Sequence, residues 1–236
     1  MSASSAAKPR RARKVLRGFA NALIIAGSLL LLDAFLTLVW EEPVSSTYAH
    51  FQQNQLSGEL DRLEKIPLTP VERKAIVKLP DPKKKLAFAA RSLDRRTDDG
   101  DAVGRLRIER IGLSSVVLEG TNADDLRRGP GHYPSAPLPG QRGTVAIAGH
   151  RTTYGAPFRK IDKVRKGDDI VVTMPYGRFT YRVEGTRIVK PTDVWVVDRR
   201  SYDRLVLTAC HPLYSAAQRI VVFARLVRSE PRGSTA

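Results

Sequence analysis

The sequence contains one cysteine, Cys210, among 236 residues, and this scarcity limits the sulfur chemistry available to the chain. A lone thiol excludes an intrachain disulfide, so Cys210 is buried and inert, paired with another molecule, or reactive. Internal repeats and low-complexity tracts are also absent, and no Cys and His residues have the spacing of a metal site. We therefore expect neither a bound metal nor a cofactor.

One apolar run, residues 18–40, is long enough to cross a membrane. Its 23 residues contain a single charged side chain, Asp33, and as a helix they would span a hydrocarbon core of about 30 Å. A cleaved signal peptide is the alternative, but its apolar region is shorter, and the best small-residue cleavage site, at residues 47–49, is weak. We therefore predict an uncleaved transmembrane anchor. Asp33 indicates a partner helix or local protonation, or it is simply tolerated in a Leu-rich helix.

Acidic residues are missing from the tail of residues 1–17 that precedes this run. The tail carries six basic residues: Lys8, Arg10, Arg11, Arg13, Lys14 and Arg17. Glu41 and Glu42 follow the run, so the positive-inside rule places the N-terminus in the cytoplasm and everything after Trp40 outside the cell. The net charge of +16 would suit a nucleic acid, but this topology disfavours one as a partner. The expected location is the cell membrane, with a single pass.

Residues 41–101 are rich in charge, and few apolar residues recur among them. Five prolines interrupt the segment: Pro43, Pro67, Pro70, Pro80 and Pro82. Helical patterns are short, at residues 48–66 and 83–96. We predict an extracellular stalk that is a mobile spacer with broken helices. The lysine run at residues 83–85 indicates contact with an anionic wall polymer or lipid, although a solvated face is the more common meaning.

From residue 102 to residue 229 the sequence changes to short apolar or alternating runs separated by Gly, Pro and Asp, as in β proteins. Candidate strands occupy residues 104–112, 114–120, 143–150, 168–175, 177–190, 193–197, 203–210 and 219–228. Short helical turns are predicted at residues 122–129 and 156–164. No strand is regularly followed by a long helix, so the predicted fold class is mainly β, a small closed barrel or sandwich. Trp195 is expected in its core, and residues 230–236 are expected to form a C-terminal tail.

The position of Cys210 favours a reactive thiol. The residue ends a strand just before Pro212, at the expected rim of a barrel, whereas a space-filling cysteine is more often found inside an apolar run. A thiol becomes a useful nucleophile as the thiolate, commonly beside an imidazole. His150 is the best candidate for that imidazole, because it also ends a strand and follows Gly149, which permits close approach of another group.

The other three histidines are weaker candidates for the base. His211 is adjacent to Cys210, and neighbours on an extended strand point to opposite faces. His132 lies in a Pro/Gly loop where a structural hydrogen bond is the default expectation, although the loop could line a substrate groove. His50 lies in the stalk and has no recognisable partner.

A third polar group is expected from strand pairing. If the strands ending at Cys210 and beginning at Arg219 form a hairpin, these two residues lie opposite each other within a few ångströms. A guanidinium placed there can donate to a developing oxyanion or hold a peptide carbonyl.

These motifs resemble those of sortases. The resemblance rests on Ala148-Gly149-His150, on Leu207-Thr208-Ala209-Cys210 and on Arg219, and it covers about residues 103–227. Residues 129–158, GPGHYPSAPLPGQRGTVAIAGHRTTYGAPF, resemble the class E sortases in particular. Val206 and Ala209 stand where the family often has threonine, a departure that bears on substrate preference more than on activity.

The resemblance implies an eight-stranded sortase β-barrel at residues 102–229 and a membrane-anchored cysteine transpeptidase of Gram-positive, actinobacterial type. Such an enzyme cleaves an LAXTG/LPXTG-like sorting signal between Thr and Gly and attaches the surface protein to a peptidoglycan amine. The expected partners are therefore surface proteins with a C-terminal sorting signal, a peptidoglycan precursor amine and the cell membrane, with no nucleic acid. The sequence shows no class C lid motif and no C-terminal span, which argues mildly against a pilin polymerase.

The resemblance also implies roles for six residues. Cys210 would attack the threonine carbonyl, His150 would protonate the leaving amine and deprotonate the incoming one, and Arg219 would stabilise the oxyanion or orient the signal. The residues expected to bind substrate are Tyr133, Thr208 and His132. For Tyr133, a role as a loop anchor is an equal alternative.

Two other functions stay open on the sequence alone. A secreted L,D-transpeptidase or cysteine peptidase also uses Cys and His, but the Ser-His-Gly-Cys type of cluster that is usual in the former is absent. The second is a membrane-anchored binding domain without catalysis, in which Cys210 is inert.

Overall fold

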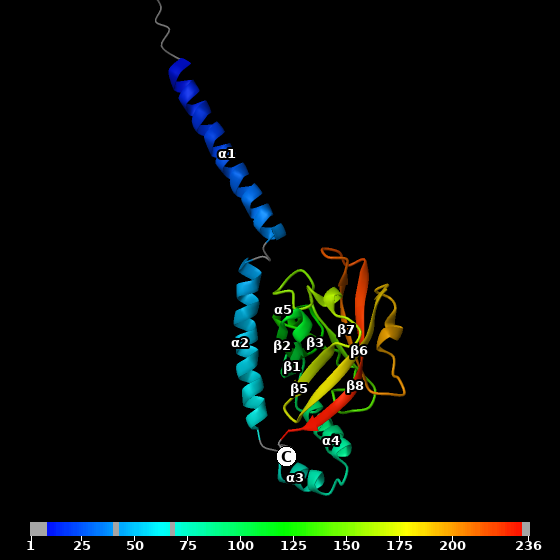
Figure 1. Ribbon diagram of the computed structural model, residues 1–236. Helices are drawn as coiled ribbons and strands as arrows, with labels where there is room; N and C mark the ends of the chain where they lie inside the picture. The colour runs from blue at the N-terminus through cyan, green and yellow to red at the C-terminus, as the bar shows by residue number, and fades with distance from the viewer. Residues whose placement is uncertain (1–8, 40–42, 67–68, 233–236) are drawn as a thin grey trace, which may run out of the picture. The chain divides into compact units, whose positions relative to one another are not determined.

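The computed structural model describes residues 9–39, 43–66 and 69–232, and the chain divides into two compact units, Met1–Pro43 and Val44–Ala236 (Figure 1). The first unit is helix α1 (Pro9–Val39). Its segment Arg13–Phe35 has a mean hydropathy of 1.9 and contains no buried residue, which fits a single-pass membrane anchor. Trp40, Glu41 and Glu42 lie outside the described residues, as do parts of both expected tails.

The second unit is built around a closed barrel with the strand order β1-β2-β3-β4-β7-β8-β6-β5. The strands are β1 (Ala102–Ile108), β2 (Leu113–Glu119), β3 (Gly131–His132), β4 (Thr144–Ala148), β5 (Asp169–Met174), β6 (Gly177–Val189), β7 (Arg204–His211) and β8 (Gln218–Pro231). Pairs β2–β3 and β4–β7 are parallel and the other six are antiparallel. The predicted eight-stranded barrel is confirmed.

One predicted strand and one predicted core residue are wrong. Residues 193–197 form the short 3-10 helix η3 (Val194–Val197), and the eighth strand is instead the two-residue β3, which no pattern indicated. A 3-10 turn repeats every three residues and so directs a single side chain inward. That side chain is Val196, which is buried, whereas Trp195 is 36% exposed and stacks on Phe223.

The apolar run of β7 is explained by burial on both faces of the strand. Leu205 and Leu207 belong to the main core inside the barrel. Val206 points the other way and packs with Val196 of η3 and Val221 of β8. A parallel strand covered on both faces has a nearly continuous apolar sequence instead of an alternating one. The same holds for β4, whose five residues are all buried.

Helix α2 (Pro43–Lys65) packs against the barrel at β2 (Figure 1). Leu56 and Leu60 are buried against Val116 and Leu118. The pairing of β2 with β3 covers only its last two residues, so the backbone of Val116 needs another partner on that side. Gln53 supplies it: its Oε1 accepts from the Val116 N–H at 2.7 Å, and its Nε2 donates to the Val116 carbonyl at 3.3 Å.

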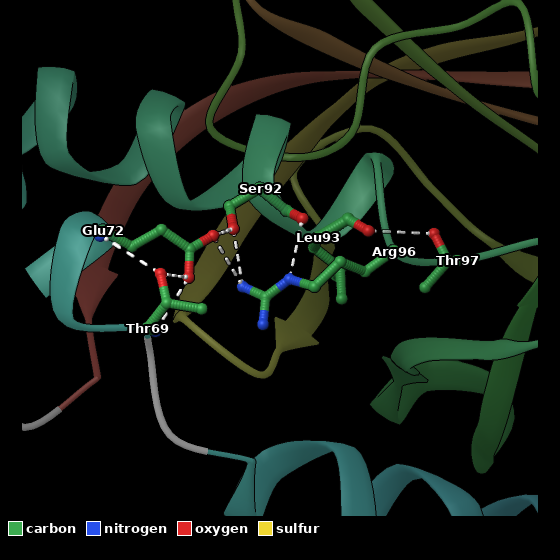
Figure 2. A network of polar contacts seen from close by, with 6 residues as sticks. All are labelled: Thr69, Glu72, Ser92, Leu93, Arg96 and Thr97. Carbon is green, nitrogen blue, oxygen red and sulfur yellow. Dashed lines mark hydrogen bonds and ion pairs between the residues drawn. The ribbon is translucent and has the colours of Figure 1, made fainter.

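Helices α3 (Pro70–Val77) and α4 (Pro82–Asp94) follow, and α4 packs on the barrel core through Leu86, Ala90 and Leu93. A polar network joins the two helices (Figure 2). Glu72 of α3 accepts from Ser92 of α4 and forms an ion pair with Arg96 at 3.2 Å. The predicted broken helices are found as α2, α3 and α4. The prediction of a mobile spacer is wrong for the described part of residues 41–101, since α2 and α4 bury apolar side chains against the barrel.

Short helical turns complete the unit. They are η1 (Glu109–Ile111), α5 (Ala123–Arg128) and η2 (Ile161–Lys163). The turn predicted at residues 122–129 corresponds to α5, which Asn122 caps by accepting from two backbone N–H groups. The turn predicted at residues 156–164 contains η2.

Candidate active site

The candidate site is built where β4 and β7 end side by side. The two strands are parallel, and their paired residues run from Thr144 opposite Arg204 to Ala148 opposite Thr208. The N–H of Gly149 then donates to the Thr208 carbonyl at 3.1 Å. His150 and Cys210 each lie two residues beyond the last pair, Ala148 and Thr208. The two residues expected to react are thus placed at one edge of the barrel by neighbouring strands.

Cys210 is a free, half-buried cysteine near the C-terminal end of β7. Its partner in the β7–β8 ladder is Arg219, so the predicted hairpin register is confirmed. The Arg219 guanidinium is directed at the loop between the strands, where Nη1 donates to the Ala216 carbonyl at 2.9 Å and to the Gln218 carbonyl at 3.0 Å. In this arrangement Arg219 holds the loop beside Cys210.

His150 follows β4 and is half-buried. Its ring centroid lies 5.2 Å from that of Tyr154, and its carbonyl accepts from the Phe158 N–H at 3.0 Å. Gly149 is required by Phe158, because a Cβ there would lie 2.7 Å from that ring. Burial lowers the pKa of His150, and the positive charge of Arg127 lowers it further. Both causes favour the neutral imidazole, which can accept the proton of a thiol.

Two of the expected substrate-binding residues touch each other. The hydroxyl oxygens of Tyr133 and Thr208 are 3.2 Å apart. Thr208 is buried two residues before Cys210, whereas Tyr133 is half-buried and lines a hollow of about 480 Å³ with Gln141 and Arg199. Tyr133 thus connects this hollow to the strand that carries the thiol.

His132 is buried and makes the structural contacts that were the default expectation for its loop, so its assignment to substrate binding gains no support from the structure. Its side chain is 2% exposed, and Nδ1 lies 2.9 Å from a carboxylate oxygen of the buried Glu119. Its Nε2 lies 3.3 Å from the Pro137 carbonyl oxygen. Both ring nitrogens therefore face acceptors inside the protein, and His132 ties β3 to the end of β2 and to the following loop.

Comparison with known proteins agrees with this geometry. A model of the sortase domain matches residues 106–227, more than half of the chain. The protein belongs to the sortase family. Sortases are cysteine transpeptidases that act on surface proteins with sorting signals and on cell wall precursors. This membership decides against an L,D-transpeptidase, another cysteine peptidase and a binding domain without catalysis.

Individual relatives cover the same barrel. Sortase D of Bacillus subtilis is 33% identical over an alignment of 136 residues that covers 56% of this chain and 67% of that protein. Sortase SrtE1 of Streptomyces coelicolor is 30% identical over 57% of this chain and 43% of its own length. The structure of sortase E from Streptomyces avermitilis is 35% identical with a TM-score of 0.54, over 59% of this chain and 96% of that one.

The sortase site also contains a contact that the sequence did not indicate. Arg151, the residue after His150, is 4% exposed, and its Nη1 lies 2.9 Å from Nδ1 of His211. Its Nη2 forms an ion pair with Asp162 of η2 at 3.1 Å. The available signal was positional: Arg151 follows the motif histidine just as His211 follows the motif cysteine. Among the described residues, no cluster of His, Cys, Asp and Glu could hold a metal ion.

Proposed function

We propose that this sortase cleaves an LAXTG/LPXTG-like sorting signal between Thr and Gly and joins the threonine to a peptidoglycan amine, with Cys210, His150 and Arg219 as catalytic residues. The observation that supports the proposal is the last pair of β4 and β7, Ala148 opposite Thr208, because His150 and Cys210 each lie two residues beyond it. A structure of Streptomyces coelicolor sortase E1 with a tripeptide in the active site, 28% identical with a TM-score of 0.54, supports a peptide substrate.

The first half of the proposed reaction forms a thioester. The Cys210 thiol gives its proton to the neutral imidazole of His150, and the thiolate attacks the threonine carbonyl carbon. The carbonyl electron pair moves onto oxygen, where Arg219 donates to it after leaving the loop carbonyls. When the carbon–nitrogen bond to glycine breaks, the imidazolium of His150 transfers its proton to the leaving amine.

The second half transfers the threonine. An incoming amine attacks the thioester carbon, and His150 takes the proton that this amine loses. The carbon–sulfur bond then breaks and the sulfur of Cys210 takes up the proton again. The product is an amide bond between the surface protein and the wall precursor, and both protein groups return to their starting forms.

We further propose a class E type of specificity, in which LAXTG is preferred to LPXTG and Tyr133 helps to select the signal. The support is the loop at residues 129–158 together with the identity to sortase E of Streptomyces avermitilis. For the first unit we propose a cytoplasmic N-terminus with the barrel outside the cell, because six basic residues precede the span.

The test is turnover of peptides by the full-length protein in detergent micelles. LAXTG and LPXTG peptides are incubated with a diaminopimelate- or glycine-type amine, and products are identified by mass. We expect cleavage after Thr and an amide product, faster for LAXTG. Cys210→Ala should abolish both, and His150→Ala should lower the rate by several orders of magnitude. Thioester formation by Cys210→Ala, or equal activity of His150→Ala, would overturn the assignment.

A further inference from the structure

The contact between Arg151 and His211 joins the two residues that directly follow the proposed base and nucleophile. We propose that this contact, the Arg151–His211 bridge, is a positioning device that sets the distance between the imidazole of His150 and the thiol of Cys210. The inference rests on the proposed function and adds two residues to it, neither of which reacts. It follows from the register of the strands, from the burial of Arg151 and from the hydrogen-bonding capacity of the two side chains.

The strand ladder by itself does not fix His150. Pairing between β4 and β7 ends at Ala148 and Thr208, and the Gly149 N–H makes a further bond to Thr208. Beyond this point β7 continues to His211 beside β8, whereas residues 151–155 form bends and a turn outside any strand. His150 therefore lies beyond the part of the chain that is paired with β7. A small shift of its segment changes the distance from the His150 ring to the Cys210 thiol.

The Arg151–His211 bridge restores a link between the two chains one residue past the reacting pair. The Gly149 bond lies on one side of His150 and the bridge on the other, so the segment is held to β7 both before and after the imidazole. The other side of Arg151 is held by Asp162, which belongs to η2 and thus to the end of the same loop. Arg151 ties the loop, β7 and η2 together.

Burial of Arg151 makes this link rigid. A guanidinium at 4% exposure loses its hydration, a cost that only well-placed partners offset. Two of its donor nitrogens have such partners, whereas Nε is buried with no partner among the described residues. The planar fork fixes the angle between its donors, so Asp162 and His211 are held in one geometry. A lysine ammonium has no such fork.

The bridge also fixes the state of His211. Arginine can only donate, so Nδ1 of His211 must accept and its proton must lie on Nε2. With Nδ1 occupied, that nitrogen is not available as a base for Cys210. This explains why the histidine adjacent to the nucleophile is not the base, and it gives His211 a function that depends on Arg151.

The test uses the full-length protein and five variants: Arg151→Gln, Arg151→Lys, His211→Ala, His211→Asn and the double variant Arg151→Gln/His211→Ala. Turnover of the LAXTG peptide gives kcat and KM, and iodoacetamide gives the rate at which Cys210 is alkylated. We expect Arg151→Gln and His211→Ala each to lower kcat about 10- to 100-fold with KM nearly unchanged, since a displacement of about 1 Å can cost about 10²-fold. Arg151→Lys should have a kcat between those of Arg151→Gln and the parent.

Two results separate positioning from a merely structural role. The double variant should be no slower than the worse single variant, because both changes break one contact. His211→Asn should stay within about threefold of the parent, because its side-chain oxygen can accept from Arg151 in place of Nδ1. Arg110→Gln is the matched control, since Arg110 also pairs with an aspartate, Asp168, but at the surface, and it should leave kcat unchanged.

The inference is overturned if the two single effects multiply, if His211→Asn is as slow as His211→Ala, or if the variants lose only thermal stability. Alkylation needs no sorting signal, so it decides independently of the proposed reaction. His150→Ala should lower the rate at which Cys210 is alkylated. The bridge variants should lower this rate as well, by at most the same factor. A parent that turns over no peptide would refute the proposed function, while the alkylation rates would still test the bridge. If Arg151→Gln fails to fold, the half-buried His211 variants carry the test.

Discussion

Cys210 and Arg219 lie opposite each other across the β7–β8 ladder, but the Arg219 guanidinium donates to the carbonyls of Ala216 and Gln218 in the connecting loop. The side chain is therefore beside the nucleophile and holds the loop in place at the same time. A peptide carbonyl oxygen beside Cys210 would be an alternative acceptor for this guanidinium. Arg219 can thus stabilise a developing oxyanion once a peptide is bound.

Replacement of Arg219 should slow the reaction without weakening peptide binding. If its guanidinium stabilises charge on the threonine carbonyl oxygen, Arg219→Ala should lower kcat about 10²- to 10³-fold with little change in KM. Arg219→Lys should fall between this variant and the parent, because lysine keeps the charge but not the planar fork. Steady-state kinetics on one LAXTG peptide checks this. Near-equal rates for the three proteins would leave Cys210 and His150 as the catalytic residues.

Removal of the charge at Arg127 should raise the pKa of His150. The positive charge of Arg127 disfavours the imidazolium, so Arg127→Gln favours protonation and moves the pKa of His150 upward. Burial is the larger cause and is unchanged, so the pKa should stay below its ordinary value. NMR titration of His150 in a Cys210→Ala background measures the shift without coupling to the thiol. A lower pKa, or the same pKa as the Arg127 parent, would contradict the expectation.

The sequence predicted those features of the site that depend on short-range patterns. Alternating and apolar runs located seven of the eight strands, and the hairpin between Cys210 and Arg219 followed from the strand ends alone. His150 could be selected because it also ends a strand. These inferences use only the period of a strand and the rule that neighbours in a hairpin face each other.

The features that were missed depend on partners far apart in the chain. A structural hydrogen bond was expected for His132, but its partner Glu119 comes from another strand, and no local pattern indicates that pair. Arg151 meets His211 across 60 residues for the same reason. Gln53 lies among other polar residues of its helix, Gln52, Asn54 and Gln55, and only the free edge of β2 explains its contact with Val116.

Glu72 should stabilise the corner between α3 and α4 in a pH-dependent way. Hydrogen bonds from Ser92 and from the Thr69 backbone, aided by the charge of Arg96, hold the pKa of Glu72 at about 2 (Figure 2). A carboxyl whose pKa is lowered on folding adds stability above its unfolded pKa of about 4.5, and this stability is lost as the pH falls through about 2. The difference in unfolding free energy between the parent and Glu72→Gln should therefore shrink from pH 6 to pH 3 in urea titrations. A difference that is independent of pH would refute this account.

Gln53 should contribute to stability through the edge of β2. Gln53→Ala leaves the N–H and carbonyl of Val116 without their side-chain partner, which should cost about 1–3 kcal/mol of unfolding free energy. Gln55→Ala, an exposed glutamine on the same helix, is the matched control and should change stability by less than about 0.5 kcal/mol. Chemical denaturation of both variants checks the difference. Equal changes in unfolding free energy for the two variants would mean that only the leucines of α2 stabilise its packing on the barrel.

Truncation to a chain that starts at Asp101 should prevent the sortase domain from folding. If the missing residues were only a spacer, their removal would leave folding and peptide turnover unchanged. The missing segment contains four buried leucines, Leu56, Leu60, Leu86 and Leu93. Each contributes about 1.5–3 kcal/mol on burial, and the sum is comparable to the total stability of about 5–15 kcal/mol of a typical domain. A chain that starts at Val44 removes only the first unit and should keep both its cooperative unfolding and its peptide turnover. Circular dichroism melts and LAXTG turnover of the two truncations decide the question. If the chain from Asp101 melted cooperatively and turned over peptide at the rate of the chain from Val44, residues 44–100 would be a spacer after all, and their packing on the barrel would carry little energy.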